Sequence, residues 1–233
     1  MPKFNDMTVN AFRKRRGRVL AKLIADLAGF LGRKIEVLDV GGRAEYWSNI
    51  DVSNIAKITL LNNEAHELVR EVPQHLSEVE LESVHGNALD LSEYGDRSVE
   101  LVHSNSVIEH VGSWVDMSVM ANETKRVGLA GWIQTPAFEF PIEPHFRAPF
   151  LHWFGQPLRR KLMYFSPHYR KLDVWQRRYH IDRINLLSGR EMRALFSDRS
   201  IYVERMLFPK SYVAHWGPLA DAPQLIQIPV EGS

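Results

Sequence analysis

The chain contains no cysteine in 233 residues. Disulfide bonds, thiolate metal sites and a cysteine nucleophile are therefore excluded, and the composition fits a reducing compartment such as the cytoplasm. The sequence also lacks any apolar run of the ~18–20 residues that a membrane-spanning helix needs. With 45% hydrophobic and 24% charged residues it has the composition of an ordinary globular protein, and we expect one domain over residues 1–233.

A large excess of charge of either sign is missing as well, since 29 Lys and Arg stand against 28 Asp and Glu. The whole molecule is thus not a polyanion binder by bulk electrostatics, and nucleic acid is not an expected partner. Positive charge is concentrated locally. A basic block spans Arg13–Arg18, and nine Arg or Lys against two acids lie between His145 and Arg183. Peripheral contact of these basic segments with an anionic membrane stays open as an alternative to simple solvation.

Residues 1–31 predict a helical segment rather than a targeting peptide. Lys22 and Asp26 interrupt the apolar core that a signal peptide would need, and no small-residue cleavage site follows. Apolar residues recur instead at helical spacing, which favours an amphipathic helix that packs on the domain. These residues are Leu20, Leu23, Ile24, Leu27 and Phe30.

Short apolar runs alternate with potential helices beyond this segment. Strands are expected at 36–40, 57–61, 81–85, 98–103 and 131–135, with helices at 64–76 and up to about 126. A helix at 187–196, with Ser188 as N-cap and Glu191 three residues on, precedes two strands at 200–208 and 211–216 that can form a hairpin. This alternation predicts an α/β fold, with a mostly parallel sheet, a C-terminal antiparallel hairpin and helices on both faces.

The alternation stops at Pro136. Residues 137–185 hold eleven aromatic residues, interleaved with most of the local basic charge. One interpretation is a cap that packs by its own aromatics. The other is an insertion that covers a substrate site, with arginines that meet an anionic substrate or a membrane surface.

Polar residues follow the apolar runs at the point where each predicted strand ends. Asp39, Gly41 and Gly42 follow the first strand, and Asn62 and Glu64 follow the second. Gly86-Asn87-Ala88 comes after the third strand, and Ser104-Asn105-Ser106 after the fourth. Ligands of parallel α/β sheets bind at the carboxyl ends of the strands, where a glycine turn lets the backbone approach them. A nucleotide-type site is therefore expected at this edge.

Two of these segments resemble motifs of the class I S-adenosylmethionine-dependent methyltransferases, in particular the small-molecule branch called type 11. Leu38-Asp-Val-Gly-Gly42 is similar to the first motif of that family, and Ser98–Val111 to its fourth-strand motif. The resemblance implies a Rossmann-like seven-stranded methyltransferase sheet that binds S-adenosylmethionine and releases S-adenosylhomocysteine. The cofactor-binding residues that it implies are Asp39, Gly41, Gly42, Arg43, Asn62, Glu64, Asn87, Ala88, Ser104, Asn105 and Ser106.

The chain departs from the family pattern at two places. Arg43 and Glu45 stand where the second and third glycines would be, which indicates a wider turn. Asn62 replaces the acid that would hold the ribose hydroxyls, with Glu64 two residues later as the alternative. Structural roles compete at several positions: Asp39 as a turn-stabilising acid, Glu64 as a first-turn helix acid, and Asn87 as a plain turn residue.

Methyl transfer to a hydroxyl needs a base, and histidine is the usual choice near neutral pH. His145 and His110 are the two candidates, with a hydrogen-bonded structural role as the alternative for each. No metal is expected, because neither Glu109-His110 nor the loose group of Glu143, His145 and His152 has a diagnostic ligand spacing.

The sequence therefore predicts an enzyme that methylates a hydroxyl of a small-molecule or glycan-type acceptor, an anionic one being favoured by the basic aromatic segment. Two alternatives remain. The altered glycine and acid positions could mark a cofactor-binding scaffold without catalysis, and the interleaved Arg and aromatic residues could serve a nucleic-acid methyltransferase.

Overall fold

The computed structural model describes residues 4–63, 74–142, 149–162 and 171–218. Two compact units make up the chain. The first unit comprises Met1–Ser104, Glu123–Ile133 and His215–Ser233, and the second comprises Asn105–Asn122 and Gln134–Ala214.

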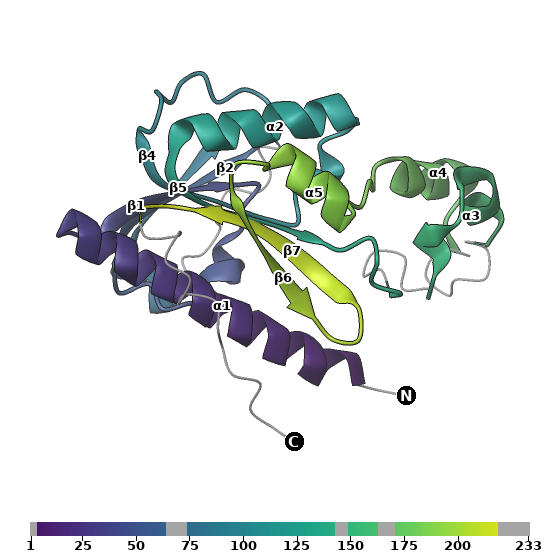
Figure 1. Ribbon diagram of the computed structural model, residues 1–233, viewed down its shortest axis with the longest axis horizontal. Helices are drawn as coiled ribbons and strands as arrows, with labels where there is room; N and C mark the ends of the chain where they lie inside the picture. Colours follow the sequence, from purple (N-terminus) through teal and green to yellow (C-terminus); the bar gives the residue numbers. More distant parts are fainter. Residues whose placement is uncertain (1–3, 64–73, 143–148, 163–170, 219–233) are drawn as a thin grey trace. The chain divides into compact units, whose positions relative to one another are not determined.

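A seven-stranded sheet has the order β3-β2-β1-β4-β5-β7-β6. The strands are β1 (Ile35–Val40), β2 (Ile55–Asn62), β3 (Glu80–His85), β4 (Val99–Asn105), β5 (Gly128–Pro136), β6 (Ser200–Arg205) and β7 (Pro209–Trp216). β2, β1 and β4 lie side by side in parallel, and β6 and β7 form the C-terminal hairpin (Figure 1). The predicted mostly parallel sheet with an antiparallel hairpin is confirmed.

The burial of the strands in the first unit follows from their places in the sheet. β1 pairs with β2 on one side and with β4 on the other, and all of its residues except Glu36 are buried. β3 lies at the edge, pairs only with β2 among the described residues, and has no buried residue. Strands covered on both faces read as continuous apolar runs, which is why β1 was the clearest strand in the sequence.

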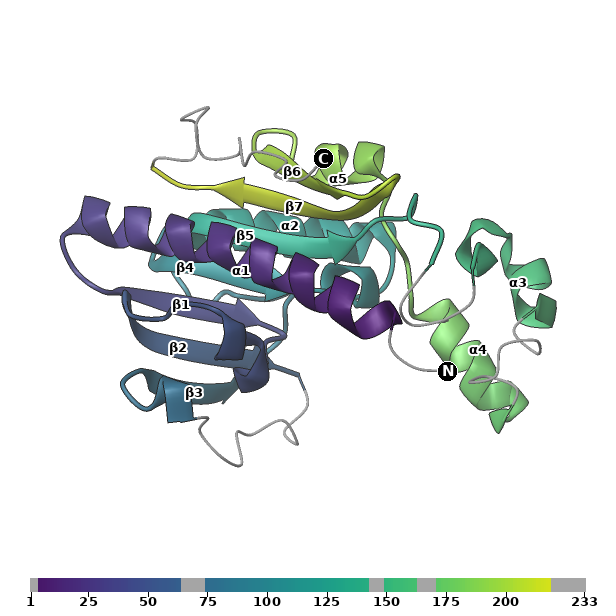
Figure 2. The same cartoon turned by 90° about the horizontal axis from the view of Figure 1, so that it is seen from below.

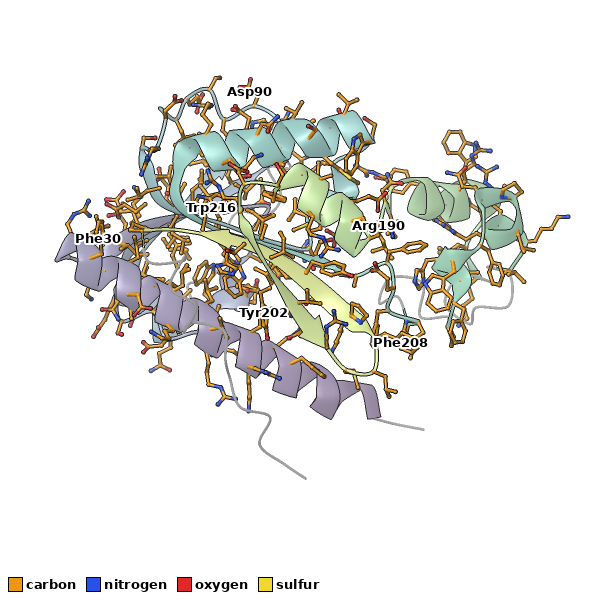
Figure 3. All side chains as sticks on the ribbon, in the orientation of Figure 1. Phe30, Asp90, Arg190, Tyr202, Phe208 and Trp216 are labelled. Atoms are coloured by element: carbon orange, nitrogen blue, oxygen red, sulfur yellow. The ribbon has the colours of Figure 1, made fainter. Side chains whose placement is uncertain are left out.

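Helix α1 (Phe4–Leu31) packs against β1 and against the short 3-10 helix η1 (Ala44–Asn49) (Figure 2). The helix begins earlier than the apolar periodicity indicated, so that the basic block lies within it. Leu20, Leu23, Ile24 and Leu27 are buried as predicted. The prediction for Phe30 is wrong: its side chain is exposed at the end of the helix (Figure 3). At ~100° per residue Phe30 lies about 80° from Leu20 around the helix, at the margin of the buried stripe.

The segment between β3 and β4 is held by Arg126, near the end of α2 (Trp114–Val127). Its guanidinium donates to the carbonyl oxygens of Leu91 and Tyr94 at 3.0 and 2.8 Å, and it forms ion pairs with Glu123 and Asp96. The Arg126 guanidinium holds the pKa of Glu123 below its usual range. This contribution to stability is therefore present above the pKa of an ordinary glutamate and is lost as the pH falls through the lowered value.

Gly131 in β5 faces Trp216 so closely that a Cβ would lie 2.1 Å from the indole ring. The same indole donates from Nε1 to the carbonyl oxygen of Gly128 at 3.2 Å (Figure 3 labels Trp216). Glycine is required here because a neighbouring ring occupies the space of its side chain.

The second unit contains η4 (Ile108–His110), η5 (Leu151–Trp153), α3 (Gln156–Leu162), α4 (Val174–Asp182) and α5 (Gly189–Leu195). The predicted capping box of α5 is confirmed, because the Ser188 side chain accepts from the Glu191 amide and the Glu191 side chain accepts from the Ser188 amide. The predicted strand 200–208 is too long. Residues 206–208 form the hairpin loop and leave Leu207 exposed, because the chain must reverse before β7.

The region between β5 and α5 contains a small apolar cluster, in which Leu162, Leu172 and Leu186 pack against the buried Leu151 and Ile184. α3 packs against α4 and against η5 (Figures 1 and 2). Within the described ranges, no helix combines the length and the apolarity that crossing a bilayer requires.

Candidate functional site

The turn after β1 lies at the topological switch point of the sheet. The chain proceeds from β1 to β2 and β3 in one direction, whereas the strand on the other side of β1 is β4. Open α/β sheets bind ligands at the carboxyl ends of the strands beside such a point. Gly41 adopts φ of +71°, which favours glycine, and its amide donates to the carbonyl oxygen of Leu61 at 2.8 Å. The strand therefore ends in a fixed and sharply turned backbone.

Asp39 lies beneath this turn and is fully buried. Its Oδ1 lies 2.6 Å from Nδ1 of His103, and its Oδ2 accepts from Nε1 of Trp47 at 2.8 Å. His103 is the register partner of Asp39 on the neighbouring strand β4 and is buried as well. The Tyr46 and Trp47 rings pack on the imidazole, with centroids 4.6 and 5.0 Å away. Both carboxylate oxygens are thus engaged inside the protein.

The carboxylate of Asp39 leaves room only for glycine at position 42, which packs against it. A Cβ at Gly42 would lie 2.0 Å from Cγ of Asp39. The carbonyl oxygen of Gly42 accepts from Nδ2 of Asn62 at 3.0 Å, which ties the turn to the end of β2. Asn62 Oδ1 has no hydrogen-bond partner among the described residues, so this half-buried residue retains an acceptor for a ligand.

Arg43 follows the turn with an extended backbone, φ −134°, a conformation that needs no glycine. It is exposed. Arg43 can therefore stand where the family pattern has a glycine, because the chain passes from the turn directly into η1. Asp39 fits a supporting role beneath the turn better than direct contact with a ligand.

Asn87 and Ala88 lie in the tight turn that follows β3. Asn87 is exposed, and its Oδ1 accepts from the amide of Leu89 at 3.0 Å. This contact is the one expected of a plain turn residue, the alternative to adenine binding. An amide oxygen has a second lone pair, so this contact leaves the binding role available. Glu64 and His145, the alternative ribose ligand and one candidate base, lie outside the described residues.

The end of β4 carries three of the predicted residues. Ser104 is buried and donates from Oγ to the carbonyl oxygen of Val40 at 3.0 Å, so it joins β4 to the glycine turn. In the second unit, Ser106 adopts φ of +58°, which is sparsely populated for any residue but glycine. Its amide donates to the Gln134 carbonyl oxygen at 2.9 Å and its Oγ to Gln134 Oε1 at 3.1 Å. Asn105 precedes it, with Oδ1 buried and without a hydrogen-bond partner among the described residues.

The other candidate base, His110, ends the 3-10 turn η4. Its side chain is 33% exposed, and its Nε2 lies 3.9 Å from Oε1 of Glu109. Glu109 is fully buried and accepts from Oγ1 of Thr135 at 3.0 Å. The accessible imidazole of His110 thus lies beside a buried carboxyl group.

A cavity of about 290 Å³ lies in the second unit. Its polar lining includes Asn185, which donates from its amide to the carbonyl oxygen of Glu109 and from Nδ2 to that of Gly112. The cavity is therefore adjacent to the η4 turn that carries His110. The lining residues are Ser113, Trp114, Met117, Phe138, His152, Arg159, Ile184, Asn185, Leu186, Leu187 and Glu191.

The charged and titratable residues of this lining have structural contacts of their own. The buried His152 lies with Nε2 2.9 Å from the carbonyl oxygen of Phe138. Arg159 donates to the carbonyl oxygens of His152 and Phe154, and Glu191 caps α5. The wall thus combines apolar and aromatic side chains with polar groups that are held by hydrogen bonds within the protein.

Sequence reasoning missed His103 and almost the whole cavity lining. The available signal for His103 was its place directly after Leu101 and Val102 in a predicted strand, because a buried imidazole needs a hydrogen-bond partner. The cavity residues come from separate segments between 113 and 191, and no local spacing unites them. No group of three or more potential metal ligands occurs within the described parts of the chain.

Comparison with known proteins supports the fold. No protein-family profile and no curated protein sequence matches the chain. Magnesium protoporphyrin IX methyltransferase from Synechocystis, solved with bound SAH, superimposes with a TM-score of 0.55 at 14% identity, over 92% of this chain and 87% of that one. An O-methyltransferase family protein from Burkholderia thailandensis gives 0.51 at 11% identity, over 89% of this chain and 59% of that one.

The fold is that of class I methyltransferases. A protein from Rhodobacter sphaeroides provisionally assigned to the zinc-dependent alcohol dehydrogenases also superimposes, with a TM-score of 0.52 at 10% identity, over 79% of this chain and 84% of that one. At these identities the likeness establishes the fold alone. Two observations on this chain separate the fold from that of dinucleotide-binding domains: β7 lies between β5 and β6, and the G-x-G-x-x-G fingerprint is absent.

Proposed function

We propose that the protein is an S-adenosylmethionine-dependent methyltransferase that methylates a hydroxyl group of a small acceptor. The observation that carries the proposal is the glycine turn at the switch point between β1 and β4, in a sheet of methyltransferase strand order. The chain cannot form the Cys₂His zinc site of alcohol dehydrogenases, because it has no cysteine. The likeness to the Rhodobacter protein therefore does not extend to that chemistry.

The residues around the turn fit the proposed cofactor. Gly41 and Gly42 offer backbone without side chains, and Gly42 has no room for one. Oδ1 of Asn62 can accept from a ribose hydroxyl at the end of β2, and Asn87 from the adenine amine at the end of β3. When bound, the cofactor supplies a sulfonium methyl group as the electrophile. Asp39 and Ser104 hold the turn in place and do not themselves contact the ligand.

The cavity in the second unit is the proposed acceptor site. Its volume corresponds to roughly ten water molecules, which suits a small organic molecule rather than a polymer. Trp114, Phe138 and Leu187 supply apolar surface, and Ser113 and Asn185 supply fixed polar groups for orientation. Catalysis requires mainly that the acceptor oxygen is held in line with the methyl group.

Binding of the cofactor is the first test. Calorimetry on the folded protein should detect S-adenosylhomocysteine and S-adenosylmethionine in the micromolar range or tighter, and no binding of NAD. NAD binding without S-adenosylhomocysteine binding would assign the switch-point turn to a dehydrogenase-type site. Absence of binding of both S-adenosylmethionine and S-adenosylhomocysteine would refute the methyltransferase.

His110 is the proposed general base, with Glu109 stabilising the imidazolium that results. His110→Gln should lower kcat by about 100- to 10,000-fold, the usual range for loss of a general base. The affinity for S-adenosylhomocysteine should remain within about threefold of wild type. Turnover would be measured as S-adenosylhomocysteine release with a panel of small hydroxylated acceptors. His145→Gln serves as the comparison, and full activity of His110→Gln with loss in His145→Gln would transfer the role to His145.

A further inference from the structure

The part of the second unit between β5 and α5 exposes an unusual share of large apolar side chains. Fifteen such side chains are exposed among the described residues, and eight of these lie between Ile142 and Tyr179. The eight are Ile142, Phe150, Trp153, Phe154, Leu158, Val174, Trp175 and Tyr179. Scattered exposed apolar residues need no explanation, but a concentration of this kind marks an interaction surface.

Helix α4 shows the feature most clearly. Trp175 is 84% exposed, Val174 67% and Tyr179 52%. At ~100° per residue these three side chains lie within an arc of about 140° that also contains the exposed Arg178, so one face of the helix presents large apolar side chains and a cation to solvent. Asp173 and Gln176 form a capping box at the N-terminus of α4, which orders the turn that carries Trp175.

The same segment carries a marked local excess of positive charge. Residues 150–183 contain eight Arg or Lys against two Asp, a formal charge of +6 in a chain whose total is +1. Lys161 in α3 and Lys171 before α4 are exposed. Arg183 donates to the hydroxyl of Tyr179 and places its guanidinium 4.7 Å from the centre of that ring. Cations are therefore interleaved with the exposed aromatic residues.

We propose that η5, α3 and α4 form a lipid-contact lobe that docks on the surface of an anionic membrane. Tryptophan and tyrosine prefer the interfacial region, where the ring lies among the acyl chains and the polar atom stays hydrated. Lysine and arginine beside them gain from the negative potential of anionic headgroups while their stems cover apolar surface. The apolar side chains of α4 alone would suit a neutral surface or another protein, and the charge of +6 selects the anionic membrane.

The attachment is peripheral. α3 and α4 have 7 and 9 residues, so they can lie in the interface plane and not cross it. The small cluster around Leu151 and Ile184 holds the lobe together without burying the apolar side chains of α4, because Trp175 and Val174 belong to its solvent side. This inference is independent of the proposed methyl transfer, although it would bring the enzyme to acceptors at a membrane surface.

Vesicle flotation tests the lobe with the whole protein. Binding is expected to vesicles of phosphatidylcholine mixed with phosphatidylserine, and not to phosphatidylcholine alone, and it should weaken with added salt. Trp175→Ala should reduce the partition coefficient about tenfold, since its largely exposed ring contributes to the lobe and not to the core. Lys161→Gln and Lys171→Gln should each reduce it about fivefold.

Two variants in the first unit serve as matched controls. Phe30→Ala removes an exposed aromatic side chain from α1, and Lys34→Gln removes an exposed cation, and neither should change the partition coefficient. Quenching of tryptophan fluorescence by brominated acyl chains should fall in Trp175→Phe while binding is retained. Equal loss in lobe and control variants, or equal binding to neutral vesicles, would overturn the proposal. Binding of a single-stranded RNA oligonucleotide in preference to anionic vesicles would reassign the lobe to nucleic acid.

Discussion

Gly42→Ala should lower the affinity for S-adenosylhomocysteine by about 100-fold or more, equivalent to about 2.7 kcal/mol. The new Cβ would lie 2.0 Å from Cγ and 2.6 Å or less from either oxygen of Asp39. The carboxylate has no room to retreat, because His103 and Trp47 hold its two oxygens and are themselves buried. The backbone of the turn must therefore move, and with it the surface on which the proposed cofactor lies.

A glycine in open surroundings provides the control for Gly42. Gly29 lies in α1, is exposed, and a Cβ there would meet no atom within 4 Å. Gly29→Ala should leave cofactor binding unchanged and stabilise the helix by about 0.5–1 kcal/mol. Calorimetry measures the affinity and thermal denaturation the stability of both variants. If Gly42→Ala binds within threefold of wild type, the turn after β1 is not the cofactor site.

The strands could be predicted well because a buried strand shows itself in a short stretch of neighbouring apolar residues. β1 is a largely apolar run, and β4 contains Val99, Leu101 and Val102 ahead of its polar end. Short runs of this kind between turn residues are typical of buried strands. Errors arose at the ends of elements. Phe30 matched the helical period but lies at the edge of the buried stripe, and residues 206–208 match a strand but form the hairpin loop. Neither outcome depends on the local pattern alone, since tertiary packing decides it.

The candidate site was predictable in position but not in its internal chemistry. The turn at residues 39–42 was located from its motif, but the reason for glycine at position 42 was not predicted: its side-chain space is filled by the carboxylate of Asp39. The partners of Asp39 were not predictable, because Trp47 and His103 approach it only after β1 and β4 pair. Arg43 likewise acquires a physical reason only in the structure, because its extended backbone leads directly into η1 and needs no glycine.

The contact between Asp39 and His103 should therefore be among the most costly to break in the protein. Asp39→Ala removes the acceptor of two buried donors, and it should lower the free energy of unfolding by about 3–5 kcal/mol. His103→Leu leaves a buried carboxylate with Trp47 as its remaining side-chain partner, and a loss of similar size is expected. Chemical denaturation measures both, and two-state behaviour would be verified by coincident fluorescence and circular dichroism transitions.

The double variant Asp39→Ala/His103→Leu distinguishes a coupled network from two separate packing defects. If the pair acts as a unit, the double variant should be destabilised by at least about 2 kcal/mol less than the sum of the single variants. Trp47 still loses its acceptor there, so wild-type stability is not expected. Strict additivity would show that Asp39 and His103 contribute independently to stability. In that case the hydrogen bond from Asn62 to the carbonyl oxygen of Gly42 would be the main contact that holds the turn. A coupled result, together with weakened cofactor binding in a still-folded Asp39→Asn variant, would establish that this buried network positions the turn for its ligand.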